Sequence, residues 1–257
     1  MDLKLTGQRA AVTGASKGIG ASVAKALAAE GCELILAARS AALLDGLAKD
    51  LKTDYGVAAT ALAVDLTTVQ GRARFAAEAG PLDILVNNAG AIPSGDLLAL
   101  DSQAWRDGWE LKVLGYIDLS REIYRAMKAR GGGVIVNIIG LAGAKPDAGY
   151  IAGSAGNAAL IQFTQALGGR SPKDGIRVVG INPSLTATDR AVAMIDHKAA
   201  TNTGVPDFKE KFLANLPFGR MAKPDEIADL TAFLASPRAG YISGAVFDVD
   251  GGIRWAS

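Results

Sequence analysis

The stretch VTGASKGIG, residues 12–20, joins a short apolar run to a segment with helical periodicity. Its glycines Gly14, Gly18 and Gly20 are spaced GxxxGxG. Glycine at such points lets the chain turn tightly and lets a pyrophosphate approach backbone N–H groups at a helix N-terminus. Glycine-rich turns also serve helix–strand packing alone, but this one falls between the first predicted strand and the first predicted helix. The turn therefore predicts dinucleotide binding.

On both sides of this turn, apolar runs alternate with helix-period segments along the chain. Strands are predicted at 9–14, 33–39, 57–66, 82–90, 132–139, 176–183 and 245–252. Helices are predicted at 19–31, 41–52, 67–80, 102–129, 150–167 and 225–236. Nearly all-apolar strands alternating with helices indicate a parallel sheet with helices on both faces, and right-handed crossovers make it doubly wound. We predict one α/β domain of Rossmann type over residues 1–257.

The segment 185–215 interrupts this alternation. It is polar, has few strand signals and centres on DHKAATNTGVPD. A long insertion after the carboxyl end of a strand in a doubly wound sheet lies over the ligand crevice. We expect a lid-like insertion, with a surface excursion as the alternative.

Composition excludes several classes of function. The 257 residues carry 27 Lys and Arg against 26 Asp and Glu, and this balance favours neither nucleic acid nor an anionic membrane as a partner. The lone Cys32 allows no intrachain disulfide, and with the lone His197 it cannot form a Cys/His metal site. There is no long apolar stretch and no signal-peptide pattern, so we expect a cytoplasmic protein.

The second predicted strand bears on the choice of dinucleotide. An NAD site normally has an acidic residue there to hold the ribose 2′-hydroxyl, but the strand ends in Ala37, Ala38, Arg39 and Ser40. A guanidinium suits a 2′-phosphate, and Lys17 in the glycine turn is a second cation for it. We predict NADP(H); the alternative is that both cations are solvated surface charges.

Four further motifs follow along the chain: NNAG at 87–90, YIAGS at 150–154, NPSLTATD at 182–189, and PFGRMAKPDEIADLTAFLASPRAGYISGAVFDVDGG at 217–252. With these motifs in this order, the chain resembles the short-chain dehydrogenase/reductase family from about residue 6 to 252. The resemblance implies a seven-stranded Rossmann-type sheet, a nicotinamide cofactor, a carbonyl or alcohol substrate, and a homotetramer or homodimer.

The resemblance also implies which residues bind the cofactor. Residues of the glycine turn would hold its phosphates, and later loops its adenine and nicotinamide ends; Arg39 and Ser40, at the end of the second predicted strand, are the residues predicted above for the 2′-phosphate. The full set is Gly14, Ser16, Lys17, Gly18, Ile19, Gly20, Arg39, Ser40, Asp65, Leu66, Asn88, Ala89, Gly90, Pro183 and Thr188.

The catalytic positions depart from the family pattern of Asn, Ser, Tyr and Lys. Tyr150 matches the tyrosine, but four residues later the lysine position holds Ser154. The serine position holds Gly140, and the asparagine position in the preceding helix holds Lys112.

A tyrosine that acts as acid/base near neutral pH needs a group that lowers its pKa, because its ordinary pKa is near 10. A nearby ammonium lowers that pKa, as the family's lysine does. We hypothesise that this lysine has moved, so that Lys112 fills the space vacated at Ser154. The alternatives are a Lys112 that reaches solvent or pairs with Glu110 or Asp118, and Lys145 as the cation.

The missing serine normally binds the substrate oxygen. Ser154, Ser184 and backbone N–H groups are candidate replacements, and Gly140 could instead make room for a bulkier substrate. The sequence as a whole predicts an NADP(H)-dependent oxidoreductase that interconverts a carbonyl and a secondary alcohol, with Tyr150 as acid/base and Lys112 as its supporting cation. The alternatives are a degenerate NADP(H)-binding sensor or subunit partner, and a non-redox enzyme such as a lyase.

Overall fold

The structure is a computed structural model that describes residues 1–201 and 207–256, apart from the side chains of residues 197, 198 and 201. Its centre is a seven-stranded sheet in the order β3-β2-β1-β4-β5-β6-β7, with every pair parallel. The strands are β1 (Arg9–Thr13), β2 (Glu33–Ala38), β3 (Ala59–Ala63), β4 (Ile84–Asn87), β5 (Gly133–Ile138), β6 (Ile176–Pro183) and β7 (Val246–Val249). The predicted doubly wound Rossmann-type fold is confirmed.

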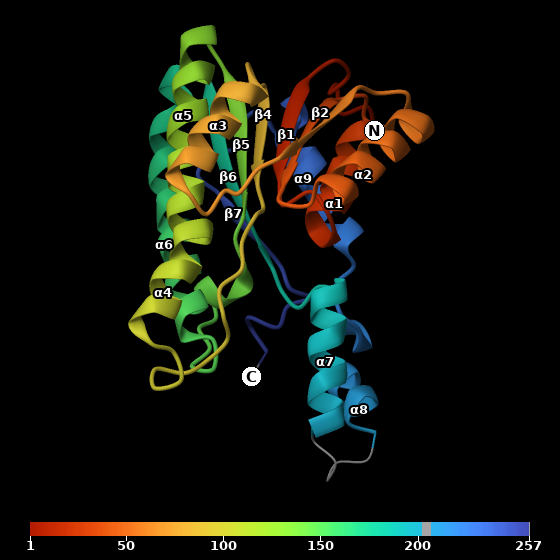
Figure 1. Ribbon diagram of the computed structural model, residues 1–257, viewed down its shortest axis with the longest axis vertical. Helices are drawn as coiled ribbons and strands as arrows, with labels where there is room; N and C mark the ends of the chain where they lie inside the picture. The colour runs from red at the N-terminus through yellow and green to blue at the C-terminus, as the bar shows by residue number, and fades with distance from the viewer. Residues whose placement is uncertain (202–206, 257) are drawn as a thin grey trace.

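Helices cover both faces of the sheet. The main ones are α1 (Gly18–Ala29), α2 (Ala41–Tyr55), α3 (Val69–Ala79), α4 (Ser102–Trp109), α5 (Gly115–Arg130), α6 (Ile151–Arg170) and α9 (Pro224–Ala235). Figure 1 shows α1, α2 and α9 on one side of the sheet and α3, α4, α5 and α6 on the other. Each face has its own apolar core, which follows from strands that are apolar on both sides.

The helix predicted over 102–129 is continuous but not regular. Between α4 and α5 lies a π-helical turn, Glu110–Leu114, which holds Lys112 at its centre. Such turns are rare and occur often at functional sites, because the extra residue changes the direction of the side chains beside it. The apolar periodicity of the sequence does not reveal this turn.

Arg72 of α3 braces this π turn. Its side chain is only 4% exposed and lies 2.7 Å from the Glu110 carboxylate and 3.1 Å from the Asp118 carboxylate. It also donates to the carbonyl oxygens of Leu66 and Thr67 at 3.1 and 3.2 Å. One buried guanidinium thus ties the helix to the chain that follows β3.

Two further helices, α7 (Asp189–Thr201) and α8 (Phe208–Ala214), lie in the segment expected to form a lid. Figure 1 shows them below the sheet, beyond the carboxyl end of β6. Residues 202–206 of the expected lid lie outside the described residues. Among the helices that the structure describes, none is both long enough and apolar enough to cross a membrane.

We expect Arg72→Ala to lower the free energy of unfolding by about 2–4 kcal/mol, because it leaves the Glu110 carboxylate and two carbonyl groups without their partner. Asp118 retains its ion pair with Arg121 at 2.7 Å. This loss of stability is at the low end for a buried ion pair, since both carboxylates are partly exposed. Urea denaturation measures it. Arg74→Ala is the matched control in the same helix: Arg74 pairs with Glu78 on the surface, so its loss should leave the urea midpoint unchanged. Equal midpoints for the two variants would contradict this role of Arg72.

Candidate active site

The glycine turn between β1 and α1 has the geometry that its sequence predicts. Gly14 and Gly18 have φ values of 67° and 58°, a conformation that glycine adopts without strain. A Cβ atom on Gly20 would overlap the carbonyl oxygen of Gly14. The residue before the helix, Lys17, does not cap it with its side chain, so the first N–H groups of α1 remain available to an anion. These features fit the pyrophosphate of a dinucleotide.

Asn88 fixes the glycine turn to the neighbouring strand β4. Its Nδ2 donates to the carbonyl oxygens of Thr13 and Gly14 at 3.0 and 3.3 Å. The Thr13 hydroxyl in turn accepts from the backbone N–H groups of Asn88 and Ala89 at 2.9 and 3.0 Å. The NNAG motif therefore holds the turn in shape at the carboxyl edge of the sheet.

The other predicted cofactor residues lie at the same edge. The position of a Cβ on Gly18 is 3.0 Å from the Thr188 methyl group, so the loop after β6 touches the glycine turn. Arg39 and Ser40 are exposed directly after β2, and Asp65 is exposed after β3 beside buried Leu66. Pro183 is the last residue of β6.

Tyr150 lies at the N-terminus of α6 and is half buried. A bridge to Gly95 holds it: Ile151 N–H donates to the Gly95 carbonyl at 3.3 Å, and Gly95 N–H to the Gly149 carbonyl at 2.8 Å. Its ring lies over Gly153, where a Cβ atom would overlap the phenol end of the ring. The tyrosine is thus fixed by a loop on one side and by its own helix on the other.

Burial raises the pKa of Tyr150 above its ordinary value, and the positive charge of Arg190 acts in the opposite direction. Arg190 is exposed near the start of α7. Sequence reasoning missed this cation, because its charge acts on Tyr150 through space and the two residues lie 40 positions apart in the chain.

Lys112 is buried, with 9% of its surface exposed. Its Nζ donates to the Ile138 carbonyl at 2.7 Å and to the Tyr116 hydroxyl at 3.0 Å, and that hydroxyl donates to the same carbonyl at 2.9 Å. Its stem crosses Gly90, where a Cβ atom would overlap the lysine Cδ. Burial lowers the pKa of Lys112 to about 7. The direct partners of Lys112 are therefore Tyr116 and Ile138.

The other arrangements considered for Lys112 are not the ones observed. It does not reach solvent, and Glu110 and Asp118 pair with Arg72 instead. The competing cation Lys145 donates to the Ile253 carbonyl at 2.6 Å, near the C-terminus.

Ser154, a candidate for the missing serine, is engaged elsewhere. Its hydroxyl donates to the Asp147 carbonyl at 3.2 Å and accepts from the Asp147 N–H at 3.0 Å. Gly140, at the family's serine position, has φ 143° and faces the side chain of Asn157. Neither Asn157 nor Tyr116 was among the predicted site residues, although Asn157 is a lone amide in a stretch of small and apolar residues.

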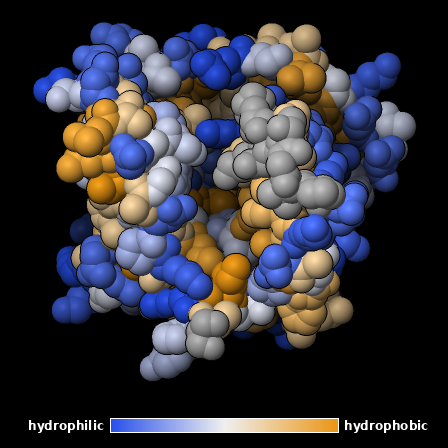
Figure 2. Space-filling view, turned by 90° about the horizontal axis from the view of Figure 1, so that it is seen from below, coloured by the Kyte–Doolittle hydropathy of each residue, from blue (hydrophilic) through white to orange (hydrophobic). Residues whose placement is uncertain are grey.

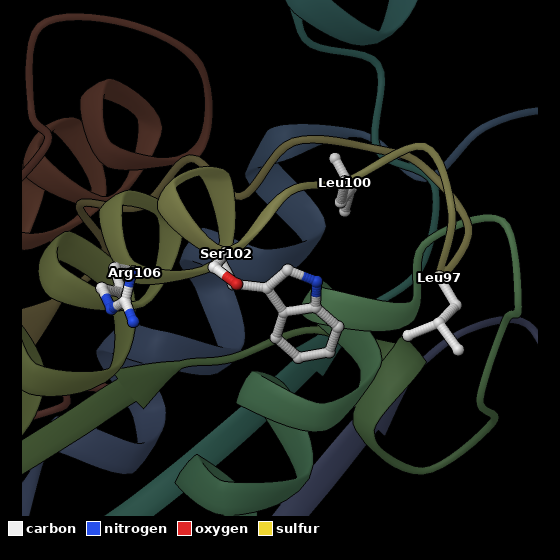
Figure 3. Close-up of a pocket in the computed structure, with 5 residues that line it drawn as sticks. Leu97, Leu100, Ser102 and Arg106 are labelled. Carbon is white, nitrogen blue, oxygen red and sulfur yellow. The ribbon is translucent and has the colours of Figure 1, made fainter.

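Figure 2 views the face at the carboxyl ends of the strands and shows a central hollow with both hydrophobic and hydrophilic side chains around it. A cavity of about 190 Å³ lies between the end of β6 and the C-terminal turn, and Ser184 and Asp250 are among its lining residues. A larger cavity of about 470 Å³ lies at the start of α4. Its lining residues are Leu97, Leu100, Ser102, Trp105 and Arg106 (Figure 3). None of the predicted site residues lines the larger cavity.

Comparison with known proteins identifies the family. Residues 8–199 match the family profile described as short chain dehydrogenase. The chain is 39% identical over 255 residues to galactitol 2-dehydrogenase (L-tagatose-forming) of Cereibacter sphaeroides, covering 97% of this chain and 96% of the relative. The chain belongs to the short-chain dehydrogenase family.

Solved structures agree with this assignment. L-sorbose reductase from Gluconobacter frateurii, solved with NADPH and L-sorbose, superimposes with a TM-score of 0.93 at 33% identity and full coverage of both chains. A 7α-hydroxysteroid dehydrogenase with NADH and 7-oxo glycochenodeoxycholic acid gives 0.88 at 29% identity, covering 98% of this chain and 96% of that one. These relatives are reductases and dehydrogenases, so family membership makes the chain an oxidoreductase of the carbonyl/alcohol type.

Against this family, the site combines a matching tyrosine with an unusual cation. In the family pattern the lysine lies on the same helix as the tyrosine; here a buried lysine comes from the π turn on the preceding helix. A lysine whose pKa is about 7 exchanges its proton near neutral pH. Chemically, the arrangement offers a phenol and an amine at the carboxyl edge of the sheet, beside a dinucleotide cradle.

We expect Gly153→Ala to displace the Tyr150 ring, because the new Cβ would occupy the space of its phenol end. Reductase activity should fall at least about 10²-fold, in the range of a lost acid/base group. Cofactor affinity should hold, because the glycine turn is distant in the chain and unchanged. Initial-rate assays and fluorescence titration of NADPH separate the two effects.

Gly169→Ala is the control in the same helix, since nothing lies within 4 Å of a Cβ there. It should keep full activity and raise stability slightly. If both variants were equally active, the placement of Tyr150 over Gly153 would not matter for turnover.

The lowered pKa of Lys112 predicts a pH dependence of stability. Between pH 7 and the unfolded value of 10.5, the unfolded lysine is protonated while the folded one is neutral. The unfolded state then binds more protons, so stability rises with pH across this window, by at most about 1.4 kcal/mol per pH unit. Urea denaturation at several pH values, compared with Lys112→Met, should show this slope in the native protein only. If the stability of the two proteins varied with pH in the same way, the burial of a lysine without a carboxylate partner would be contradicted.

Proposed function

We propose that this protein is an NADP(H)-dependent oxidoreductase that interconverts a ketone and a secondary alcohol, with Tyr150 as acid/base and Lys112 as its supporting cation. The observation that carries the proposal is the buried Lys112, which has no carboxylate partner among the described residues and lies in the helix that precedes Tyr150 in the chain. A buried amine with no counter-ion costs folding free energy, so its retention favours a role in chemistry.

NADP(H) is supported by two kinds of observation. Arg39 and Lys17 are exposed at the ends of β2 and of the glycine turn, where a 2′-phosphate would lie, and the second strand ends without a carboxylate. L-sorbose reductase of Gluconobacter frateurii was solved with NADPH, and a gluconate 5-dehydrogenase relative of Beutenbergia cavernae with NADP. The nicotinamide supplies or accepts a hydride at the carbon of the substrate.

The side chains of the protein transfer the proton to or from the substrate oxygen. In the reducing direction Tyr150 donates its phenolic proton to the carbonyl oxygen, and in the oxidising direction it accepts the proton of the alcohol. Burial alone disfavours the phenolate of Tyr150. Lys112, when protonated, favours the phenolate and replenishes its proton near neutral pH, and Arg190 adds a second positive charge from α7.

The first substrates to assay follow from the relatives. Galactitol 2-dehydrogenase forms L-tagatose, and L-sorbose reductase binds L-sorbose. Ketoses and polyols are therefore the substrate class to test first. A homotetramer or homodimer and a lid role for α7 and α8 remain predictions.

The test exchanges the lysine between its two positions. With L-sorbose or L-tagatose and NADPH, Lys112→Asn should lower kcat/KM by about 10²-fold or more. Ser154→Lys added to Lys112→Asn restores the family's Asn and Lys positions and should recover part of that loss. Tyr150→Phe should abolish turnover without weakening NADPH binding.

Three results would contradict the proposal. Full activity of Lys112→Asn would show that Lys112 does not support the acid/base. Turnover by Tyr150→Phe would show that Tyr150 is not the acid/base. Tight NADPH binding with no turnover of any carbonyl compound, and no effect of Tyr150→Phe, would instead indicate a cofactor-binding protein without hydride transfer.

A further inference from the structure

Asn157 is a buried amide whose side chain makes no hydrogen bond to any residue that the structure describes. Its side chain lies on α6, only 3% of the residue is exposed, and its Oδ1 has no hydrogen-bond partner within the described residues. Its Nδ2 likewise makes no hydrogen bond there. An unpaired buried amide costs stability, and native proteins keep few of them. The free Nδ2 is the group that can donate a hydrogen bond to a ligand, whereas Oδ1 can only accept one.

The amide points to the place where a catalytic side chain is missing. A Cβ atom on Gly140 would lie 2.7 Å from Asn157 Nδ2 and 3.7 Å from its Oδ1. The nitrogen therefore occupies the space next to Gly140 into which a side chain at that position would project. The turn Leu141–Gly143 packs tightly on the backbone of Asn157, since a Cβ on Gly143 would lie 2.6 Å from the Asn157 carbonyl carbon. This close packing fixes the amide relative to Gly140.

The same amide lies on the face of α6 that the Tyr150 ring covers. The phenol end of Tyr150 lies over Gly153, and Asn157 follows Gly153 by four residues on the same face of α6. Side chains four apart on a helix have Cβ atoms roughly 5–6 Å apart. The Tyr150 ring and the Asn157 side chain therefore lie on one face of α6, about one helical turn apart.

We propose that Asn157 donates a hydrogen bond from Nδ2 to the carbonyl oxygen of the substrate and so replaces the serine that Gly140 lacks. This inference rests on the proposed function, and it adds a substrate-binding residue to that site. The hydrogen bond stabilises the negative charge that develops on the oxygen as hydride reaches the carbonyl carbon and before the proton of Tyr150 is transferred. Glycine at position 140 is then a condition for this arrangement, because any side chain there would collide with the amide.

The first test replaces the amide by an apolar side chain of similar size. Asn157→Leu should lower kcat/KM for the ketose by about 10²–10³-fold, the range for loss of one oxyanion donor. Its affinity for NADPH should remain that of the wild type. Its melting temperature should equal or exceed that of the wild type, because an unpaired buried amide has been removed. A purely structural asparagine would give the reverse: a lower melting temperature with activity kept in the folded fraction.

Ser171 provides the matched control. Its hydroxyl is also buried and unpaired within the described residues, and it follows α6 about 20 Å along the helix axis from Asn157. Ser171→Ala should therefore keep or raise the melting temperature and leave kcat/KM unchanged. Comparing Asn157→Leu with Ser171→Ala separates the effect of losing a polar group at the site from the effect of losing any buried, unpaired polar group.

A double-mutant cycle with Gly140→Ser tests the replacement directly. In the wild-type background the serine should lower activity, because its Cβ meets the Asn157 amide. In an Asn157→Ala background the same serine has room and offers the missing hydroxyl, so it should raise activity. Backbone strain from φ 143° is common to both backgrounds and cancels in the cycle.

The outcomes separate this inference from the proposed function. If the wild type turns over ketose and Tyr150→Phe does not, the function holds. In that case, wild-type kcat/KM in Asn157→Leu, or an equal effect of Gly140→Ser in both backgrounds, overturns the role of Asn157 alone. If the wild type turns over no carbonyl compound, the proposed function fails and this inference fails with it.

Discussion

The close approach of α1 to the carboxyl ends of β1 and β4 is the constraint on which the rest of the site depends. Gly20 has no room for a side chain, because the carbonyl oxygen of Gly14 occupies the space. Asn88 closes the contact by binding the backbone of the turn. This contact leaves the N–H groups of α1 directed at the edge of the sheet where β4, β5 and β6 also end. The anion cradle and the side chains that follow those strands therefore share one edge.

The chemistry at that edge depends on buried polar groups drawn from different elements. Lys112 comes from the π turn, Tyr150 from the start of α6, and Asn157 from the second turn of the same helix. Two of them are costly to bury as they stand: the lysine has no carboxylate partner among the described residues, and the asparagine oxygen has no partner at all there. Residues kept against a cost to stability are candidates for function, because folding alone would select apolar side chains at these positions.

The sequence predicts the fold well because its signals are local. The alternation of apolar strands with helices and the glycine turn each lie within one stretch of chain, and both are confirmed in the structure. The third strand is shorter than predicted, at Ala59–Ala63, and the irregular centre of the long helix is not visible in the apolar pattern. A single π turn changes the direction of Lys112 without changing the composition around it.

The site was only partly predictable, because its residues come from segments that lie far apart in the sequence. Lys112, Tyr150 and Gly140 stand out against the family pattern, so the sequence alone draws attention to them. Tyr116 and Asn157 become visible only when β5 and α6 are brought together in space. For Asn157 the sequence offers one signal, a lone amide in the small and apolar stretch SAGNAALI, residues 154–161. That signal identifies a polar residue on a buried helix face but does not give its neighbour.

The measurement that tests the central claim most directly is a crystal structure with NADP and a ketose bound, read for the distance between Lys112 Nζ and the Tyr150 hydroxyl oxygen. The account predicts that the two atoms lie within about 6 Å, or are joined by one water, so that the charge of the lysine acts on the phenol. A lysine that remains bound only to Tyr116 and Ile138, farther from Tyr150 and with no water between them, would contradict it.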